Sequence, residues 1–201
     1  MNGFEKRKQQ KMNQILQAAT HLFSTNGVQQ TSVSNIAKAA HVSQVTIFNY
    51  FESKQKLIEQ AIQHFMDIEH SKFHDIVHSK ELSFAEKTEK LIINKSTLAI
   101  TIYPDFYEII MQEYAKPDSW ISQSFWERGM ELFHLFFEQG KNEGMIDPSL
   151  SHETIFFYID MMTSYLQKEE VYKTILPHTK EIMNLFFYGI AGKQNKQEEK
   201  L

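Results

Sequence analysis

The chain has 201 residues and a mass of 23.7 kDa, which suits one large domain or two small ones. It contains no cysteine, which excludes disulfide scaffolds, thiolate metal sites, iron–sulfur clusters and cysteine nucleophiles. Taken over the whole chain, the formal net charge of −4 argues against binding to nucleic acid, because nucleic-acid-binding domains are usually basic.

Helical periodicity dominates the chain from its first element onward. Apolar residues recur every three or four positions over residues 8–26, and Gly27 then marks a helix end. Ser32, Ser43 and Ser53 are suitable N-caps for three further helices. These reach to about residues 40, 50 and 78. Five more helices are predicted over residues 84–101, 104–114, 119–142, 151–168 and 178–189.

The sequence therefore predicts an all-α protein with about nine helices, since no period-two run is long enough for a strand. We expect a DNA-binding head over residues 1–53 and a ligand-binding and dimerisation domain over residues 54–201. The helix over 54–78 would link the two.

Charge is distributed unevenly between these parts. Residues 1–60 hold seven basic and three acidic side chains, so they carry +4 and the remainder carries −8. Between Glu5 and Glu52 lie 46 consecutive residues without a carboxylate, in a chain that has 25. This asymmetry indicates a basic module joined to an acidic one, although short segments also fluctuate by a few charges.

Residues 31–54 have the layout of a helix-turn-helix, in which two short helices flank the turn over residues 40–43. The turn separates an apolar core from an outward polar face. The expected core is Leu22, Phe23, Ile36, Ala37, Ala40, Val42 and Ile47. Gln44, Thr46, Asn49 and Tyr50 would reach base edges and phosphates in a major groove. A structural or protein-binding helix-turn-helix is the alternative, but the absence of carboxylates favours DNA, whose phosphates they would repel.

Residues 8–60 resemble the N-terminal domain of the TetR family of bacterial transcriptional regulators. The features that match in order and spacing are Leu22-Phe23, Asn26-Gly27, Thr31-Ser32-Val33, Ile36-Ala37, Ala40, Val42-Ser43, Thr46-Ile47-Phe48, Tyr50-Phe51, Ser53-Lys54 and Leu57. The resemblance implies an all-α homodimer whose two heads each insert one helix into successive major grooves. It also implies a C-terminal domain that dimerises and binds a small molecule.

Carried over by position, the resemblance implies phosphate contacts from Thr31 or Ser32 and from Lys54. It implies a DNA face formed by Gln44, Val45, Thr46, Phe48, Asn49 and Tyr50. Three positions depart from the family pattern. His41 stands where the turn usually has glycine, and Val45 where a small residue is common. Phe48 stands where a tyrosine hydroxyl often reaches a phosphate, so we expect Phe48 to contribute packing only.

Twenty-one aromatic residues follow residue 60, together with several methionines. Such side chains line adaptable apolar cavities, but they also fill ordinary cores and dimer faces. The candidate pocket residues are Phe106, Tyr107, Met111, Trp120, Trp126, Phe133, Phe137, Tyr158, Met162 and Tyr165. The candidate polar anchors for an apolar or aromatic effector are Tyr107, Glu108, Gln112, Tyr158 and Tyr165. By resemblance, the last two helices form the dimer interface, with candidates Ile155, Ile159, Met162, Leu185 and Phe186.

Motifs for catalysis or cofactor binding are absent from the sequence: it has no HExxH, GxSxG, P-loop or dinucleotide fingerprint. His70, His74 and His78 share one helix face, which is more often a solvated stripe than a metal site, so we predict no metal and no cofactor. No targeting signal precedes the first helix, and we expect a cytoplasmic location. The sequence thus predicts a homodimeric repressor that binds operator DNA and is released by a small hydrophobic effector. The alternative is an architectural or adaptor DNA-binding protein without a ligand.

Overall fold

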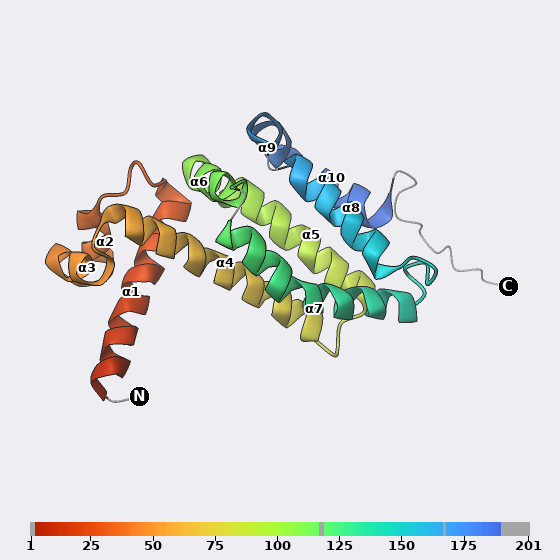
Figure 1. The fold of residues 1–201 in the computed structure, drawn as a ribbon, viewed down its shortest axis with the longest axis horizontal. Helices are drawn as coiled ribbons and strands as arrows, with labels where there is room; N and C mark the ends of the chain where they lie inside the picture. Colours follow the sequence, from red (N-terminus) through yellow and green to blue (C-terminus); the bar gives the residue numbers. More distant parts are fainter. Residues whose placement is uncertain (1–2, 117–118, 167, 190–201) are drawn as a thin grey trace. The chain divides into compact units, whose positions relative to one another are not determined.

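The computed structural model describes residues 3–116, 119–166 and 168–189 (Figure 1). Over these residues the protein has ten α-helices, one 3-10 helix and no strand, which confirms the all-α prediction. The sequence predicted about nine helices, and the additional α-helix is the short α9. None of the helices in these ranges is both long and apolar enough to cross a membrane. The elements are α1 (Gly3–Asn26), α2 (Val33–Ala39), α3 (Gln44–Phe51), α4 (Lys54–His78), α5 (Phe84–Thr101), α6 (Pro104–Tyr114), α7 (Trp120–Asn142), α8 (His152–Leu166), α9 (Glu169–Ile175), η1 (Leu176–His178) and α10 (Thr179–Tyr188).

The chain forms two compact units, each with its own contacts. Unit 1 comprises residues 1–75 and 101–133, and unit 2 comprises residues 76–100 and 134–201. Because α4, α5 and α7 each run from one unit into the other, unit 1 holds more of the chain than the predicted head over residues 1–53. The functional division at residue 53 stays a prediction.

In unit 1, α1, α2 and α3 pack around most of the core that the sequence predicts, and only Leu22 and Val42 of the predicted set are half-buried. Phe23, Ile36, Ala40 and Ile47 are almost completely buried, as is Ala37. Ser32 caps α2 and its side chain accepts a hydrogen bond from the Asn35 amide. Ser43 caps α3, since its Oγ accepts a hydrogen bond from the Thr46 amide at 3.0 Å. The helix-turn-helix is therefore held by a small apolar core and two serine caps.

The turn between α2 and α3 places His41 in a left-handed conformation, with φ at 51°. This is the position at which the sequence departs from the glycine of the family pattern. A side chain with a Cβ costs roughly 1–2 kcal/mol in this region, although histidine tolerates it better than most residues. The departure from glycine at His41 therefore carries a conformational cost in this turn.

Replacing His41 by glycine is expected to raise the free energy of unfolding by up to about 1 kcal/mol, since relief of the strain exceeds the added flexibility of the unfolded chain. Chemical denaturation would measure the change. Lys38→Gly in the exposed part of α2 is the matched control, and it should lower the free energy of unfolding by about 1 kcal/mol. Equal decreases for both substitutions would contradict the assignment of strain to His41.

The loop after α1 is tied to the start of α6 by a carboxylate. Both oxygens of Asp105 accept hydrogen bonds from backbone amides, one from Val28 and one from Gln29, each at 3.0 Å. Gly27 has φ at 87°, and a Cβ there would lie 2.6 Å from the Tyr103 ring. The Tyr103 amide also donates to the Ser24 carbonyl at 2.8 Å. The loop and the first turn of α6 are therefore packed too closely for any residue but glycine at position 27.

Unit 2 is held by packed aromatic rings and one buried lysine. The Phe84 and Phe136 rings lie 4.6 Å apart. The Lys87 ammonium donates to the Val77 carbonyl and to Gln139 Oε1, each at 2.6 Å. Burial lowers the pKa of Lys87, whereas the nearby carboxylate of Glu143 acts to raise it. These bonds connect the end of α4 and the start of α5 to α7.

Candidate nucleic-acid interface

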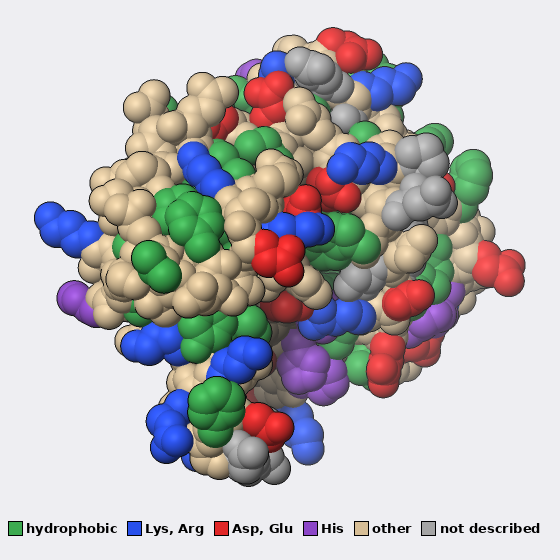
Figure 2. Space-filling model, turned by 60° about the vertical axis from the view of Figure 1, so that its left-hand side comes forward, with side chains coloured by type: hydrophobic (Ala, Val, Ile, Leu, Met, Phe, Trp, Pro, Cys, Tyr) green, Lys and Arg blue, Asp and Glu red, His purple; other side chains and the backbone are tan. Residues whose placement is uncertain are grey.

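The outward side of α3 carries most of the predicted DNA face. Gln44, Phe48 and Asn49 are exposed, as is Val45, which keeps 68% of its surface accessible. Thr46 and Tyr50 are half-buried. Figure 2 shows the surface over α2 and α3 on the left of its view, where hydrophobic side chains lie among uncharged polar ones. This surface suits a major groove, because it offers hydrogen-bonding and apolar groups and no carboxylate.

The two alternatives for the phosphate contact before α2 differ sharply in exposure. Thr31 is only 2% exposed, and its hydroxyl donates to the Gly27 carbonyl at 2.6 Å. Ser32 is exposed at the N-terminus of α2, where its hydroxyl bonds to Asn35 Oδ1 at 2.5 Å. Thr31 therefore stabilises the loop, and Ser32 is the one of the pair that lies at the surface.

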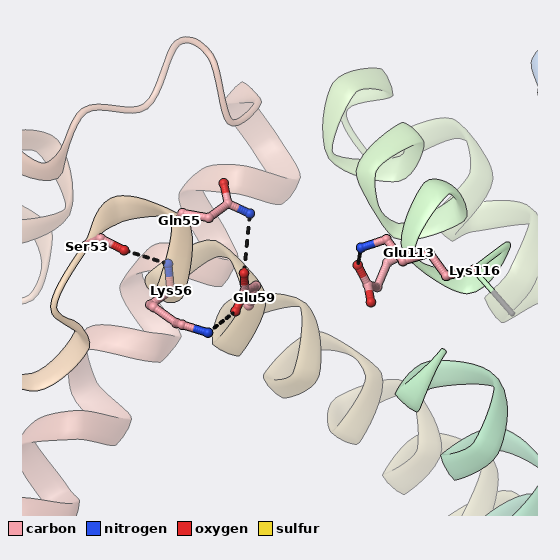
Figure 3. Close-up of polar contacts among 6 residues, drawn as sticks. All are labelled: Ser53, Gln55, Lys56, Glu59, Glu113 and Lys116. Atoms are coloured by element: carbon pink, nitrogen blue, oxygen red, sulfur yellow. Dashed lines mark hydrogen bonds and ion pairs between the residues drawn. The ribbon is translucent and has the colours of Figure 1, made fainter. Parts of the chain in front are cut away.

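Two lysines at the start of α4 already have partners within the protein. Lys54 donates to the Val28 carbonyl at 3.0 Å, which leaves two of its three ammonium hydrogens for a phosphate. Lys56 donates to Glu59 at 3.0 Å (Figure 3), and this hydrogen bond raises the pKa of Lys56 and lowers that of Glu59. Figure 3 also shows the separate Lys116–Glu113 pair at the end of α6. Positive charge at the start of α4 is therefore partly satisfied by neighbouring groups.

The predicted pocket residues are divided between the two units. Phe106 is fully buried in the core of unit 1, with its ring 6.1 Å from Phe23 and 5.5 Å from Phe65. Phe133 contacts Phe73 in the same unit, where Tyr107, Met111 and Trp120 are half-buried. In unit 2, Phe137 is buried and Tyr158 stacks on Phe186. The Trp126 side chain lies outside the described residues.

Met162 and Tyr165 do line a shared cavity, an open groove of about 710 Å³ in unit 2. Of the predicted polar anchors, Tyr165 is among the residues that line this groove. Two others, Glu108 and Gln112, are hydrogen-bonded to each other on α6. Lys168 lies 5.2 Å from the centre of the Tyr165 ring. The other lining residues come from α8, α9 and α10 and the segments between them: Phe157, Asp160, Met161, Ser164, Leu166, Val171, Ile175 and Ile182.

The exposed apolar residues of α8 lie on a different face of the helix from the residues predicted to form the dimer interface. Ile159 is buried within unit 2, and Ile155, Met162 and Phe186 are half-buried. The exposed row is instead Phe157, Met161 and Tyr165, with Leu185 of α10 also exposed. Phe157 keeps 71% of its surface accessible. The signal for Phe157 and Met161 was present in the sequence, because apolar residues on two faces of one helix indicate that both faces are covered.

Three of the four histidines of α4, namely His70, His74 and His78, are not arranged as one metal site. His70 Nε2 lies 3.2 Å from the Arg128 carbonyl oxygen, and His74 Nδ1 lies 3.4 Å from Asp75. Arg128 also pairs with Asp67 at 2.5 Å. Within the described part of the chain, no group of three histidine or carboxylate side chains is placed to hold a metal ion.

Comparisons with known proteins single out the same N-terminal segment. Residues 15–61 match the family model "Bacterial regulatory proteins, tetR family". The transcriptional repressor KstR2 of Rhodococcus jostii is 28% identical over 103 residues, which cover 49% of this chain and 50% of that repressor. This chain thus aligns with only half of the length of KstR2.

Two further matches extend over nearly the whole chain. The fatty acid metabolism regulator protein of Bacillus subtilis is 24% identical over 196 residues, covering 94% of this chain and all of that protein. The crystal structure of FadR from Bacillus subtilis with stearoyl-CoA has the same fold, with a TM-score of 0.51 and 22% identity. It covers 88% of this chain and 98% of that one. The helix-turn-helix lies within the segment that matches the family model, so residues 15–61 form a DNA-binding domain of the tetR family of bacterial regulatory proteins.

Proposed function

We propose that the protein is a homodimeric transcriptional repressor that binds operator DNA and is released by a fatty acyl effector. The observation that carries the proposal is the helix-turn-helix of residues 31–54, in the segment that matches the tetR family, with its exposed, carboxylate-free α3. An α-helix of this kind fits a B-DNA major groove and reads bases through side chains near its N-terminus.

The DNA-binding part of the proposal predicts a specific loss at Gln44, which is exposed in the first turn of α3. Gln44→Ala is expected to weaken binding to a selected operator about 10- to 100-fold, because a good side chain–base contact contributes roughly 1–3 kcal/mol of discrimination. An operator selected from random DNA and a fluorescence anisotropy titration would measure it. The thermal midpoint of unfolding should not change, since the Gln44 side chain is exposed.

Gln63→Ala on the exposed side of α4 is the matched control and should bind the operator as the unchanged protein does. If Gln44→Ala and Gln63→Ala bound equally well, α3 would not be the reading helix.

Support for the homodimer comes from the exposed apolar row on α8. Phe157, Met161 and Tyr165 are spaced four residues apart, so they form one continuous stripe. A two-fold axis could place this stripe against its own copy, together with Leu185 of α10. Two heads in one dimer would also match a palindromic operator with half-sites about one helical turn apart.

Support for the effector class comes from the full-length relative, whose name assigns it to fatty acid metabolism. The largely apolar lining of the groove in unit 2, which includes Met161 and Met162, agrees with a ligand that has a long hydrocarbon chain. The FadR structure of the same fold contains stearoyl-CoA. A ligand releases DNA only by the difference between its affinities for the bound and free states of the protein.

Titration of the protein–operator complex with stearoyl-CoA, stearate and coenzyme A would test the effector. We expect stearoyl-CoA or stearate to release the DNA, and their comparison would show whether the thioester is recognised. Coenzyme A alone should have no effect. The second candidate function, an architectural DNA-binding protein, would bind without sequence preference and would respond to none of the three.

A further inference from the structure

The first turns of α1 form a cluster of positive charge, which we name the basic foot. It consists of Lys6, Arg7, Lys8 and Lys11, with Glu5 as the one acidic residue in the same stretch. Residues 3–10 are all exposed, and the first buried residue of the helix is Ile15. Because a helix rises 1.5 Å per residue, the foot reaches about 13 Å beyond the part of α1 that packs in the core. Packing in the core of unit 1 therefore does not account for the positive charge at this end of α1.

The charges of the basic foot are also available. Among the described residues, Lys6, Arg7 and Lys8 have no ion-pair partner, and Lys11 bonds only to the side-chain amide of Gln14, at 3.1 Å. Lys54 and Lys56, by contrast, are bonded to Val28 and Glu59. Apart from Lys38 on α2, the cations that could neutralise phosphates near the helix-turn-helix are thus concentrated on α1 rather than at the start of α4.

The foot lies on the same side of unit 1 as the reading helix. In Figure 1 the N-terminal end of α1 projects downward, below α2 and α3. In Figure 2 Lys and Arg side chains gather at the lower end of the same face that shows the α2–α3 surface. The phosphate backbone of a DNA duplex that runs along this face would pass both the basic foot and α3.

We propose that the basic foot of α1 binds the phosphates of operator DNA outside the base pairs that α3 reads. The foot would add affinity without adding sequence preference, because phosphates are the same at every position. This inference rests on the proposed function, since it assumes that α3 lies in a major groove. It extends the DNA interface from the helix-turn-helix to the flanking backbone on each side of the operator.

The test replaces Lys6, Arg7, Lys8 and Lys11 together by glutamine, which keeps the helix propensity close to that of the original residues. The matched control replaces Lys80, Lys90, Lys95 and Lys180 by glutamine, four exposed residues of unit 2 that change the net charge equally. Operator affinity is measured against salt concentration on two duplexes. One ends at the edge of the selected operator, and the other carries ten further base pairs on each side.

On the long duplex, the foot variant should bind at least 10-fold more weakly than the unchanged protein near 0.1 M salt. The slope of log affinity against log salt should fall by about 0.9 for each phosphate that the variant no longer neutralises. The ratio of operator to random-DNA affinity and the thermal midpoint should not change. The short duplex should abolish the difference between the variant and the unchanged protein, and the control variant should bind both duplexes normally.

Equal slopes for the foot variant and the unchanged protein on the long duplex would overturn the inference while leaving the proposed function intact. An equally large decrease in affinity on the short duplex would also overturn it, because the foot would then bind within the operator. Failure of the unchanged protein to prefer any sequence would overturn the proposed function, and the inference with it.

Discussion

Replacing Phe157 and Met161 by glutamate is expected to convert the protein from a dimer to a monomer and to weaken operator binding by at least 100-fold. Both side chains are exposed on one stripe of α8, so the substitutions should leave unit 2 folded. In a dimer they would face the partner, where four buried carboxylates cost more than the apolar contact contributes. A single head then loses the effective concentration that the second head supplies, which is typically worth a factor of about 10² to 10⁴.

Light scattering after gel filtration would give the mass of each variant, and the anisotropy titration would give its operator affinity. Ile93→Glu with Ile100→Glu is the matched control, because both isoleucines are exposed on α5 and Ile100 keeps 77% of its surface accessible. The control should remain a dimer. A dimeric Phe157→Glu/Met161→Glu protein, or a monomeric control, would show that the dimer uses another face.

The sequence predicted the helix-turn-helix well, because nearby residues determine it. Ser32 and Ser43 cap the helices that follow them, and Ile36, Ala40 and Ile47 occupy the predicted core. Even the positive φ of His41 could be expected from the family pattern at that position. Capping and short-range apolar spacing depend on a few neighbouring residues, so a single sequence carries most of the information.

The aromatic residues of the second half were harder to assign. Phe106 looks like a pocket residue in the sequence, but it packs between Phe23 and Phe65, which are 83 and 41 residues away along the chain. The row Phe157, Met161 and Tyr165 was missed because its neighbours Ile155 and Ile159 have the same helical spacing. Whether an aromatic side chain fills a core, a groove or an interface depends on long-range packing, and composition alone does not determine it.

The contact between Asp105 and the loop after α1 shows the same limit, because nothing local in the sequence pairs residue 105 with residues 28 and 29. The carboxylate holds two backbone amides at 3.0 Å, and the Val28 side chain is buried. The loop carries on directly to Thr31 and Ser32, which precede the helix-turn-helix. Asp105 therefore links the position of α6 to the conformation of the segment that leads into α2.

Replacing Asp105 by alanine is accordingly expected to lower the free energy of unfolding of unit 1 by about 2–3 kcal/mol. Each hydrogen bond to a charged group contributes roughly 1.5–3 kcal/mol, and the total is reduced because Gln29 is exposed. Asp105→Asn should lower it by about half as much, since its amide oxygen can still accept one of the two bonds. Urea unfolding followed by tryptophan fluorescence would measure this, because Trp120 and Trp126 both belong to unit 1.

Asp147→Ala is the control for the removal of a carboxylate that caps a backbone amide. Asp147 accepts a hydrogen bond from the Ser149 amide at 2.8 Å, but this bond spans only two residues and lies in an exposed turn of unit 2. Its removal should leave the tryptophan-detected transition unchanged. If Asp105→Ala and Asp147→Ala unfolded at the same urea concentration, the Asp105 contact would be incidental to unit 1. A lower midpoint for Asp105→Ala alone would mean that α6 stabilises the loop leading into the DNA-binding helices, so that any displacement of α6 reaches them through two hydrogen bonds.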